Sequence, residues 1–215
     1  TDAYATWFDA GADRFLLRFE TSNRTIYDRI HPPVGKTPSD RLAILRNLRK
    51  IGYEIGSGVM LGVPGQAYND LARDIELFGE LDLDMIGVGP YIAHPDTPLA
   101  HEADLDDGEQ VPNTEGMTYK VLALTRILYP GVNIPATTAL ATLNKAKGRE
   151  LGLSRGANVL MPNLTPVQYR ESYDIYPAKA CVKETAVQCN GCMRGRIASI
   201  GRTVGTGRGD SPHWQ

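Results

Sequence analysis

The sequence has little that would hold the protein on a membrane or a polyanion. It contains no apolar run of the roughly 18 residues that cross a bilayer, and no basic-then-apolar signal segment opens it. Its 23 Lys and Arg residues are offset by 25 Asp and Glu residues, so the net charge is -2. This balance excludes general attraction to nucleic acid or to anionic lipid, and we expect a cytoplasmic protein. Because the first residue is Thr1, we expect the chain to begin within a domain.

Cysteine is also scarce, with three residues that all lie between positions 181 and 192. An odd number of closely spaced cysteines does not make a disulfide framework. The spacing of Cys181, Cys189 and Cys192 can instead supply three thiolates to an iron–sulfur cluster or to zinc. Water, an exogenous group or a side chain such as His213 would be the fourth ligand. Free thiols or one disulfide are the alternatives.

Segments typical of strands and helices alternate along the chain. Strand patterns cover 14–21, 53–63, 85–90, 133–138 and 158–161, and helical spacing covers 39–52, 69–81, 118–128 and 149–155. This repetition predicts parallel strands joined by crossover helices. A doubly wound dinucleotide fold is disfavoured because no Gly-x-Gly-x-x-Gly follows the first strand.

Polar or special residues at the ends of the strands favour a TIM-type barrel, which places its chemistry there. They are Arg18 with Glu20, 64–66, 90–91, Thr137 with Thr138, and 162–163. Five strand-helix units cannot close an eight-stranded barrel, and we expect the other units to precede Thr1. We divide the chain into a partial barrel at 1–165 and a cysteine-containing extension at 166–215.

The two faces of the second strand differ in composition. Aliphatic residues occupy one face, and Gly56, Gly58, Met60 and Gly62 occupy the other. If the aliphatic face meets the helices, glycine and the Arg18/Glu20 charges line the lumen, where ordinary barrels place branched hydrophobes. We therefore expect a hollow barrel with room for a charged ligand. The alternative is that the glycines only relieve crowding between strands.

Five stretches resemble the HydE family of radical S-adenosylmethionine (SAM) enzymes, the FeFe-hydrogenase maturases. They are GADRFLLRFET at 11–21, GVMLGVPGQ at 58–66, GVGPYIAHPDTPL at 87–99, ALTRILYP at 123–130 and NIPATTA at 133–139. The resemblance extends from residue 10 to about 192 and includes the three cysteines. It is closer than the resemblance to biotin synthase or methylornithine synthase. It implies an α/β fold that forms a partial (β/α)8 radical SAM barrel, the C-terminal portion of such an enzyme.

The family resemblance implies that a 4Fe-4S cluster binds SAM and that a 5'-deoxyadenosyl radical reacts with a small-molecule or organometallic substrate in the lumen, in assembly of the hydrogenase active-site cluster. Other hydrogenase maturation proteins would be its partners. Glu20 and Arg41 would hold the amino acid part of SAM. The implied substrate-binding residues are Arg18, Met85, Thr137, Thr138 and Tyr176. The implied ligands of an accessory cluster, 2Fe-2S or 4Fe-4S, are Cys181, Cys189 and Cys192.

The sequence departs from this family at one motif. The Cys-x3-Cys-x2-Cys that holds the radical-generating cluster is absent, so its ligands would lie outside this chain, and we expect the chain alone to be inactive. Open barrel edges would favour self-association. The alternatives are a methylornithine or biotin synthase-like enzyme, or a non-catalytic module that binds iron–sulfur or zinc.

Two further features carry structural expectations. We expect His94 to shape its loop, because prolines and Asp96 surround it. The tripeptide Arg208-Gly209-Asp210 lies in a Gly-rich tail that we expect to be mobile.

Overall fold

The structure is a computed structural model that describes residues 2–33, 39–102, 108–173, 175 and 177–212. Its sheet contains the parallel strands β1 (Arg14–Leu16), β2 (Glu54–Leu61) and β3 (Met85–Pro90), in the order β1-β2-β3. The predicted parallel arrangement is thus confirmed. Tyr176 and His213 lie outside the described residues.

The fourth and fifth predicted strands are reduced to single bridges that continue the sheet. Met85 pairs with Asn133, and Pro135 pairs with Val159, both in parallel orientation. Pro135 has no N–H to donate to a ladder. The Asn158 side chain accepts the Ile134 N–H at 2.7 Å, so side-chain bonding replaces part of the regular pairing.

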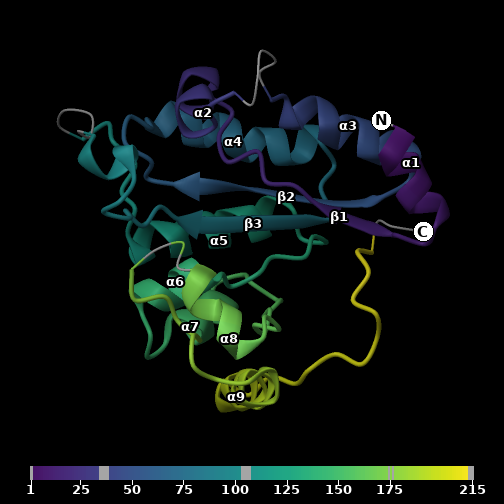
Figure 1. The fold of residues 1–215 in the computed structure, drawn as a ribbon, viewed down its shortest axis with the longest axis vertical. Coiled ribbons are helices and arrows are strands. Elements are labelled where there is room, and N and C mark those ends of the chain that lie inside the picture. The colour runs from purple at the N-terminus through teal and green to yellow at the C-terminus, as the bar shows by residue number, and fades with distance from the viewer. Residues whose placement is uncertain (1, 34–38, 103–107, 174, 176, 213–215) are drawn as a thin grey trace.

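Helices alternate with these strands, as the spacing predicts. They are α1 (Asp2–Asp9), α2 (Arg24–Ile30), α3 (Arg41–Ile51), α4 (Tyr68–Glu80), α5 (Glu115–Leu128), α6 (Thr138–Leu143), α7 (Gly148–Ser154), α8 (Val167–Arg170) and α9 (Ala186–Ser199), with 3-10 turns at Pro98–His101 and Glu171–Tyr173. In Figure 1, α2, α3 and α4 lie along one side of the strands, and α6, α7 and α8 lie on the other. In the described ranges, no helix is long and apolar enough to cross a membrane.

Local sequence explains where the helices begin and end. Asp40 caps α3 by accepting the Ala43 N–H at 2.9 Å, and Gly52 ends it in the left-handed conformation. The residue pattern does not predict α2, which Asn23 caps by accepting from the backbone N–H groups of Thr25 and Ile26. A helix of only seven residues carries too little periodicity to be distinguished from a loop.

The aliphatic face of the strands forms the core, as predicted. Ile55, Val59 and Leu61 of β2 are fully buried with Ile86 and Val88 of β3. Helices α3 and α4 pack on β2, while α5 and α6 pack on β3. The opposite face of the strands is therefore directed toward the barrel interior.

The expectation of a mobile C-terminal tail is wrong for its described part. The tail returns from α9 to the start of β1 (Figure 1). There Arg208 pairs with Asp13 at 2.5 Å, and Asp210 pairs with Arg14. The backbone N–H of Ser211 also donates to buried Glu54 at 2.8 Å. Long-range charge pairing therefore anchors a segment whose composition alone suggested mobility.

Candidate functional site

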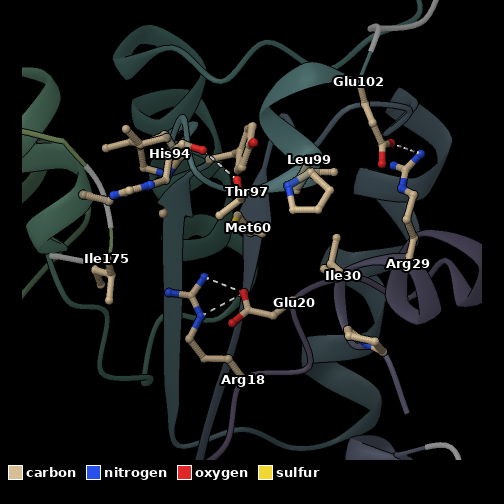
Figure 2. Close-up of a pocket in the computed structure, with 17 residues that line it drawn as sticks. Arg18, Glu20, Arg29, Ile30, Met60, His94, Thr97, Leu99, Glu102 and Ile175 are labelled. Atoms are coloured by element: carbon tan, nitrogen blue, oxygen red, sulfur yellow. Dashed lines mark hydrogen bonds and ion pairs between the residues drawn. The ribbon is translucent and has the colours of Figure 1, made fainter. Parts of the chain in front are cut away.

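A cavity of about 510 Å³ opens at the C-terminal ends of the strands. Its wall includes residues from the strands and from the segment that follows β3, together with residues of other elements (Figure 2). They are Arg18, Glu20, Met60 and Gly89 at the strands, His94, Thr97 and Leu99 after β3, and Arg29, Glu102, Ala139 and Ile175. This confirms the expected hollow at this end of the barrel. The volume lies within the roughly 300–1,000 Å³ of small-ligand pockets.

Farther from the strand ends, the glycines do not line the cavity. A Cβ on Gly56 would lie 2.7 Å from the Leu16 side chain, and one on Gly58 would overlap the backbone of Gly87. Here the glycines allow the strands to pack closely. The alternative explanation, that glycine relieves crowding between strands, therefore applies to this part of the interior.

The charge pair in the cavity wall is Arg18 with Glu20. Arg18 Nη2 lies 3.0 Å from Glu20 Oε2 and donates to the Val59 carbonyl at 2.5 Å. Glu20 has φ of +67°, a left-handed conformation that is uncommon for a residue other than glycine. Its backbone still bonds to β2, accepting from Met60 N at 3.0 Å. Because the two side chains are only 29% and 18% exposed, a ligand at this wall would meet partly desolvated charges.

Gly89 brings Thr137 close to Arg18. A Cβ at Gly89 would lie 3.5 Å from Thr137 Oγ1 and 3.7 Å from Arg18 Nη1, so both groups border the space above this glycine. Thr137 is buried and caps α6 by accepting the Leu140 N–H at 3.3 Å. Two residues predicted for one ligand, far apart in sequence, therefore both lie close to Gly89, although only Arg18 lines the cavity.

Thr137 does not itself line the cavity, and three other predicted site residues also lie outside its wall. Arg41 begins α3 and donates to the Arg18 carbonyl at 2.6 Å. This hydrogen bond holds the backbone of Arg18 in place. Met85 begins β3, opposite Gly56 and four residues before Gly89. Thr138 is the first residue of α6, and it is its neighbour Ala139 that lines the cavity. Tyr176 lies outside the described residues.

The rim of the cavity carries polar residues that the sequence pattern does not predict. Arg29 of α2 pairs with Glu102 at 2.8 Å, and both line the mouth (Figure 2). His94 shapes its loop, as expected, since its Nδ1 accepts from Asp96 N at 3.2 Å. It also lines the cavity. No periodic pattern marks His94 or Glu102, and only their placement after the third strand could have suggested them, whereas Arg29 lies on α2, which the residue pattern does not predict.

A buried carboxylate supports the turn that follows Glu20. Asp74 of α4 is fully buried and accepts the Ser22 N–H at 2.5 Å and the Gln66 Nε2–H at 3.2 Å. Burial raises the pKa of Asp74 to about 6, although the hydrogen bonds from Ser22 oppose this. The turn is therefore held by an acid that changes charge just below neutral pH.

We expect this carboxylate to make stability depend on pH. Because the pKa of Asp74 is raised on folding, its stabilising contribution is full below about pH 4 and is lost as pH rises to about 6. Two pKa units correspond to about 3 kcal/mol. Urea unfolding of wild type and Asp74→Asn should show the free energy of unfolding of wild type falling relative to the variant across this window. Parallel curves would contradict the assignment.

Cys189 and Cys192 lie on α9, and Cys181 lies in the segment that precedes this helix. Cys189 is buried and its Sγ accepts from Asn163 N at 3.2 Å, whereas Cys181 and Cys192 line a separate pocket of about 360 Å³. Burial raises the pKa of the Cys181 thiol, and Arg149 opposes this. Within the described part of the chain, no three His, Cys, Asp or Glu side chains are grouped so that they could hold a metal ion. The predicted accessory cluster site stays a prediction.

Comparison with known proteins connects this site to a family. The chain is 46% identical over 202 residues to the [FeFe] hydrogenase maturase subunit HydE of Thermotoga maritima, covering 94% of this chain and 55% of that protein. It is 30% identical over 155 residues to biotin synthase of Brucella canis, covering 71% of the chain and 43% of the relative. No protein-family model matches.

Solved structures share the fold. Methylornithine synthase (PylB) matches with a TM-score of 0.69 at 19% identity, covering 95% of this chain and 56% of that one. HydG, a maturase of the [FeFe]-hydrogenase, matches with a TM-score of 0.66 at 19% identity, covering 92% and 42%. These matches confirm the partial barrel. The chain spans about half the length of the curated relatives it matches, and by its identity to HydE it belongs to the HydE family.

Proposed function

We propose that this chain forms the SAM- and substrate-binding wall of a radical SAM enzyme of HydE type, which acts in assembly of the [FeFe]-hydrogenase active-site cluster. The observation that carries the proposal is the Arg18–Glu20 pair facing a cavity of about 510 Å³, in a chain 46% identical to HydE. The chain has no Cys-x3-Cys-x2-Cys, so the ligands of the 4Fe-4S cluster would come from outside these residues. We accordingly expect the chain alone to be inactive.

The cavity wall fits the amino acid part of SAM. The Glu20 carboxylate suits an ammonium group, because charge-assisted hydrogen bonds are stronger than neutral ones. Arg41 lies close enough to act electrostatically on the same region as Glu20. The pKa of His31 shows this, because it is lowered by burial and by the charge of Arg41 and raised by the charge of Glu20. SAM bound to a reduced cluster would supply a 5'-deoxyadenosyl radical. The protein side chains would bind and orient its polar groups and keep water from the reaction space.

The space beside Arg18 and Gly89 fits a substrate carboxylate. Arg18 presents a planar fork of donors, and Thr137 Oγ1 borders the same space above Gly89. A carboxylate seated there would be held at the strand ends, within the same cavity as Glu20. Fixing both ligands on one rigid sheet edge limits their relative motion, which favours reaction between them.

The alternative functions have weaker support. Identity to biotin synthase is 30% over 155 residues, against 46% over 202 residues for HydE. A non-catalytic metal-binding module would leave the Arg18–Glu20 pair and its cavity without a role. We therefore favour the HydE-type maturase.

The test measures SAM binding and cleavage in this chain and in a chain extended upstream in its reading frame. Anaerobic iron and sulfide quantitation with EPR should show that the extended chain gains a 4Fe-4S signal that SAM perturbs, with formation of 5'-deoxyadenosine. Failure of the extended chain to respond to SAM would overturn the proposal.

We expect Glu20→Gln to raise the Kd for SAM about tenfold to a hundredfold, because removing one partner of a partly buried charge pair costs about 1.4–3 kcal/mol. Glu76→Gln is the matched control, since Glu76 is 68% exposed on α4 and does not line the cavity. Isothermal titration of the extended chain with SAM would show equal affinity in both variants if Glu20 does not contact SAM.

A further inference from the structure

His94 is a cavity residue to which the proposed function gives no role. Figure 2 shows His94 and Thr97 on one side of the cavity and the Arg18–Glu20 pair on the other. The side chain of His94 is only 22% exposed. A hydrogen bond between its ring and a ligand would therefore form in a partly desolvated place, where it is stronger than in water.

The two ring nitrogens of His94 differ in what they can offer a ligand. Nδ1 accepts the backbone N–H of Asp96 at 3.2 Å, whereas the exposed Asp96 carboxylate lies 3.8 Å away, too far for a hydrogen bond. Because Nδ1 accepts, the hydrogen of the neutral ring lies on Nε2. Among the residues that the structure describes, Nε2 makes no hydrogen bond. His94 therefore offers the cavity an N–H donor.

The segment around His94 holds the ring before a ligand arrives. The His94 carbonyl accepts from Thr97 Oγ1 at 2.8 Å and from Thr97 N at 3.0 Å. The next residue, Pro95, has a fixed φ, and its carbonyl lies 3.1 Å from His101 Nε2. A donor that is already held in place loses little side-chain entropy on binding, so its hydrogen bond contributes to affinity.

We propose that His94 is a substrate-binding residue whose Nε2–H donates to a second acceptor group of the ligand, remote from the carboxylate at Arg18. The proposal rests on the proposed function, which places a carboxylate at Arg18. It narrows the substrate class to small carboxylates that carry another hydrogen-bond acceptor at the far end, because an apolar end would leave the Nε2–H unpaired. A cavity of about 510 Å³ has room for both groups.

A set of small carboxylates can probe this second contact. The dicarboxylates succinate, glutarate and adipate are each compared with the monocarboxylate of the same chain length, butanoate, pentanoate or hexanoate. Isothermal titration of the extended chain should show at least one dicarboxylate binding about tenfold more tightly than its monocarboxylate, the effect of one hydrogen bond to a charged group. If every dicarboxylate binds no more tightly than its monocarboxylate, the proposal is wrong.

His94→Asn separates ligand binding from the shaping of the loop. An asparagine side chain accepts the backbone N–H two residues later, as Nδ1 does here, but it has no group at the position of Nε2. We expect this variant to bind both members of each pair alike, and we expect the longer amide of His94→Gln to keep a preference of about threefold for the dicarboxylate. An unchanged preference in His94→Asn would mean that His94 only shapes its loop, and loss in both variants would contradict a donor at this position.

Two further variants identify the cause of a changed preference. His101→Asn alters an exposed histidine of the same segment that does not line the cavity, so it should keep the wild-type preference. A loss there would point to disturbance of the segment and would overturn the contact. Arg18→Gln should weaken the dicarboxylate and the monocarboxylate by the same factor. If Arg18→Gln binds both as wild type does, the carboxylate site of the proposed function fails, whereas an unchanged preference in His94→Asn refutes only the role of His94.

Discussion

Replacing Arg18 with glutamine should weaken binding of a carboxylate-bearing substrate by about a hundredfold, because loss of a partly desolvated charge partner costs about 2–5 kcal/mol. Arg18 is anchored from two directions, by Glu20 at 3.0 Å and by the Val59 carbonyl at 2.5 Å. Its fork is therefore fixed before a ligand arrives, and little side-chain entropy is lost on binding. Glutamine keeps a polar group there but loses the charge and the fork.

Arg18→Lys separates charge from geometry. It keeps the positive charge but cannot present two parallel donors, and we expect an intermediate loss of about tenfold. Titration of the extended chain with the candidate substrate, together with 5'-deoxyadenosine formation, would measure both effects. The control is Arg24→Gln, an exposed arginine of α2 that pairs with Asp28 at 2.5 Å. If Arg18→Gln and Arg24→Gln bind alike, Arg18 does not contact the substrate.

The sequence predicted the parts of the fold that depend on local pattern. Alternation in β2 correctly placed Val59 and Leu61 in the core, and Gly52 correctly marked the end of α3. These features follow from the strand period of two and from the freedom of glycine to adopt positive φ. Neither requires knowledge of distant contacts.

Features set by contacts between distant segments were not predictable in the same way. Thr137 can approach Arg18 because Gly89 has no side chain between them. The position of Arg208 depends on its ion pair with Asp13. The family resemblance supplied Met85 as a ligand neighbour; the register of β3 with β2 places it opposite Gly56 and outside the wall of this cavity, so its role stays a prediction. Pairing register is a tertiary property that the residue pattern alone does not give.

Gly58→Ala is expected to destabilise the sheet strongly. A Cβ at Gly58 would lie 2.7 Å from the carbonyl carbon and 2.9 Å from the Cα of Gly87, its partner in the β2–β3 register, and it would overlap the carbonyl oxygen. These atoms belong to backbone that cannot rotate away, so the strands must separate. We expect a loss of about 3 kcal/mol and a fall in Tm of about 10 °C, measured by urea and thermal unfolding with circular dichroism.

Gly87→Ala is the matched control, because it makes the same chemical change on the opposing residue of the same pair. A Cβ at Gly87 meets only the Ser57 carbonyl oxygen at 3.6 Å and Pro135 Cγ at 4.0 Å, which are ordinary contacts. Alanine also lowers the entropy of the unfolded chain, so this variant should be within about 1 kcal/mol of wild type. The pair distinguishes the two explanations for glycine in this part of the barrel. If Gly58→Ala instead unfolds like Gly87→Ala but loses ligand binding, Gly58 provides space for the ligand; a selective loss of stability means that it serves strand packing.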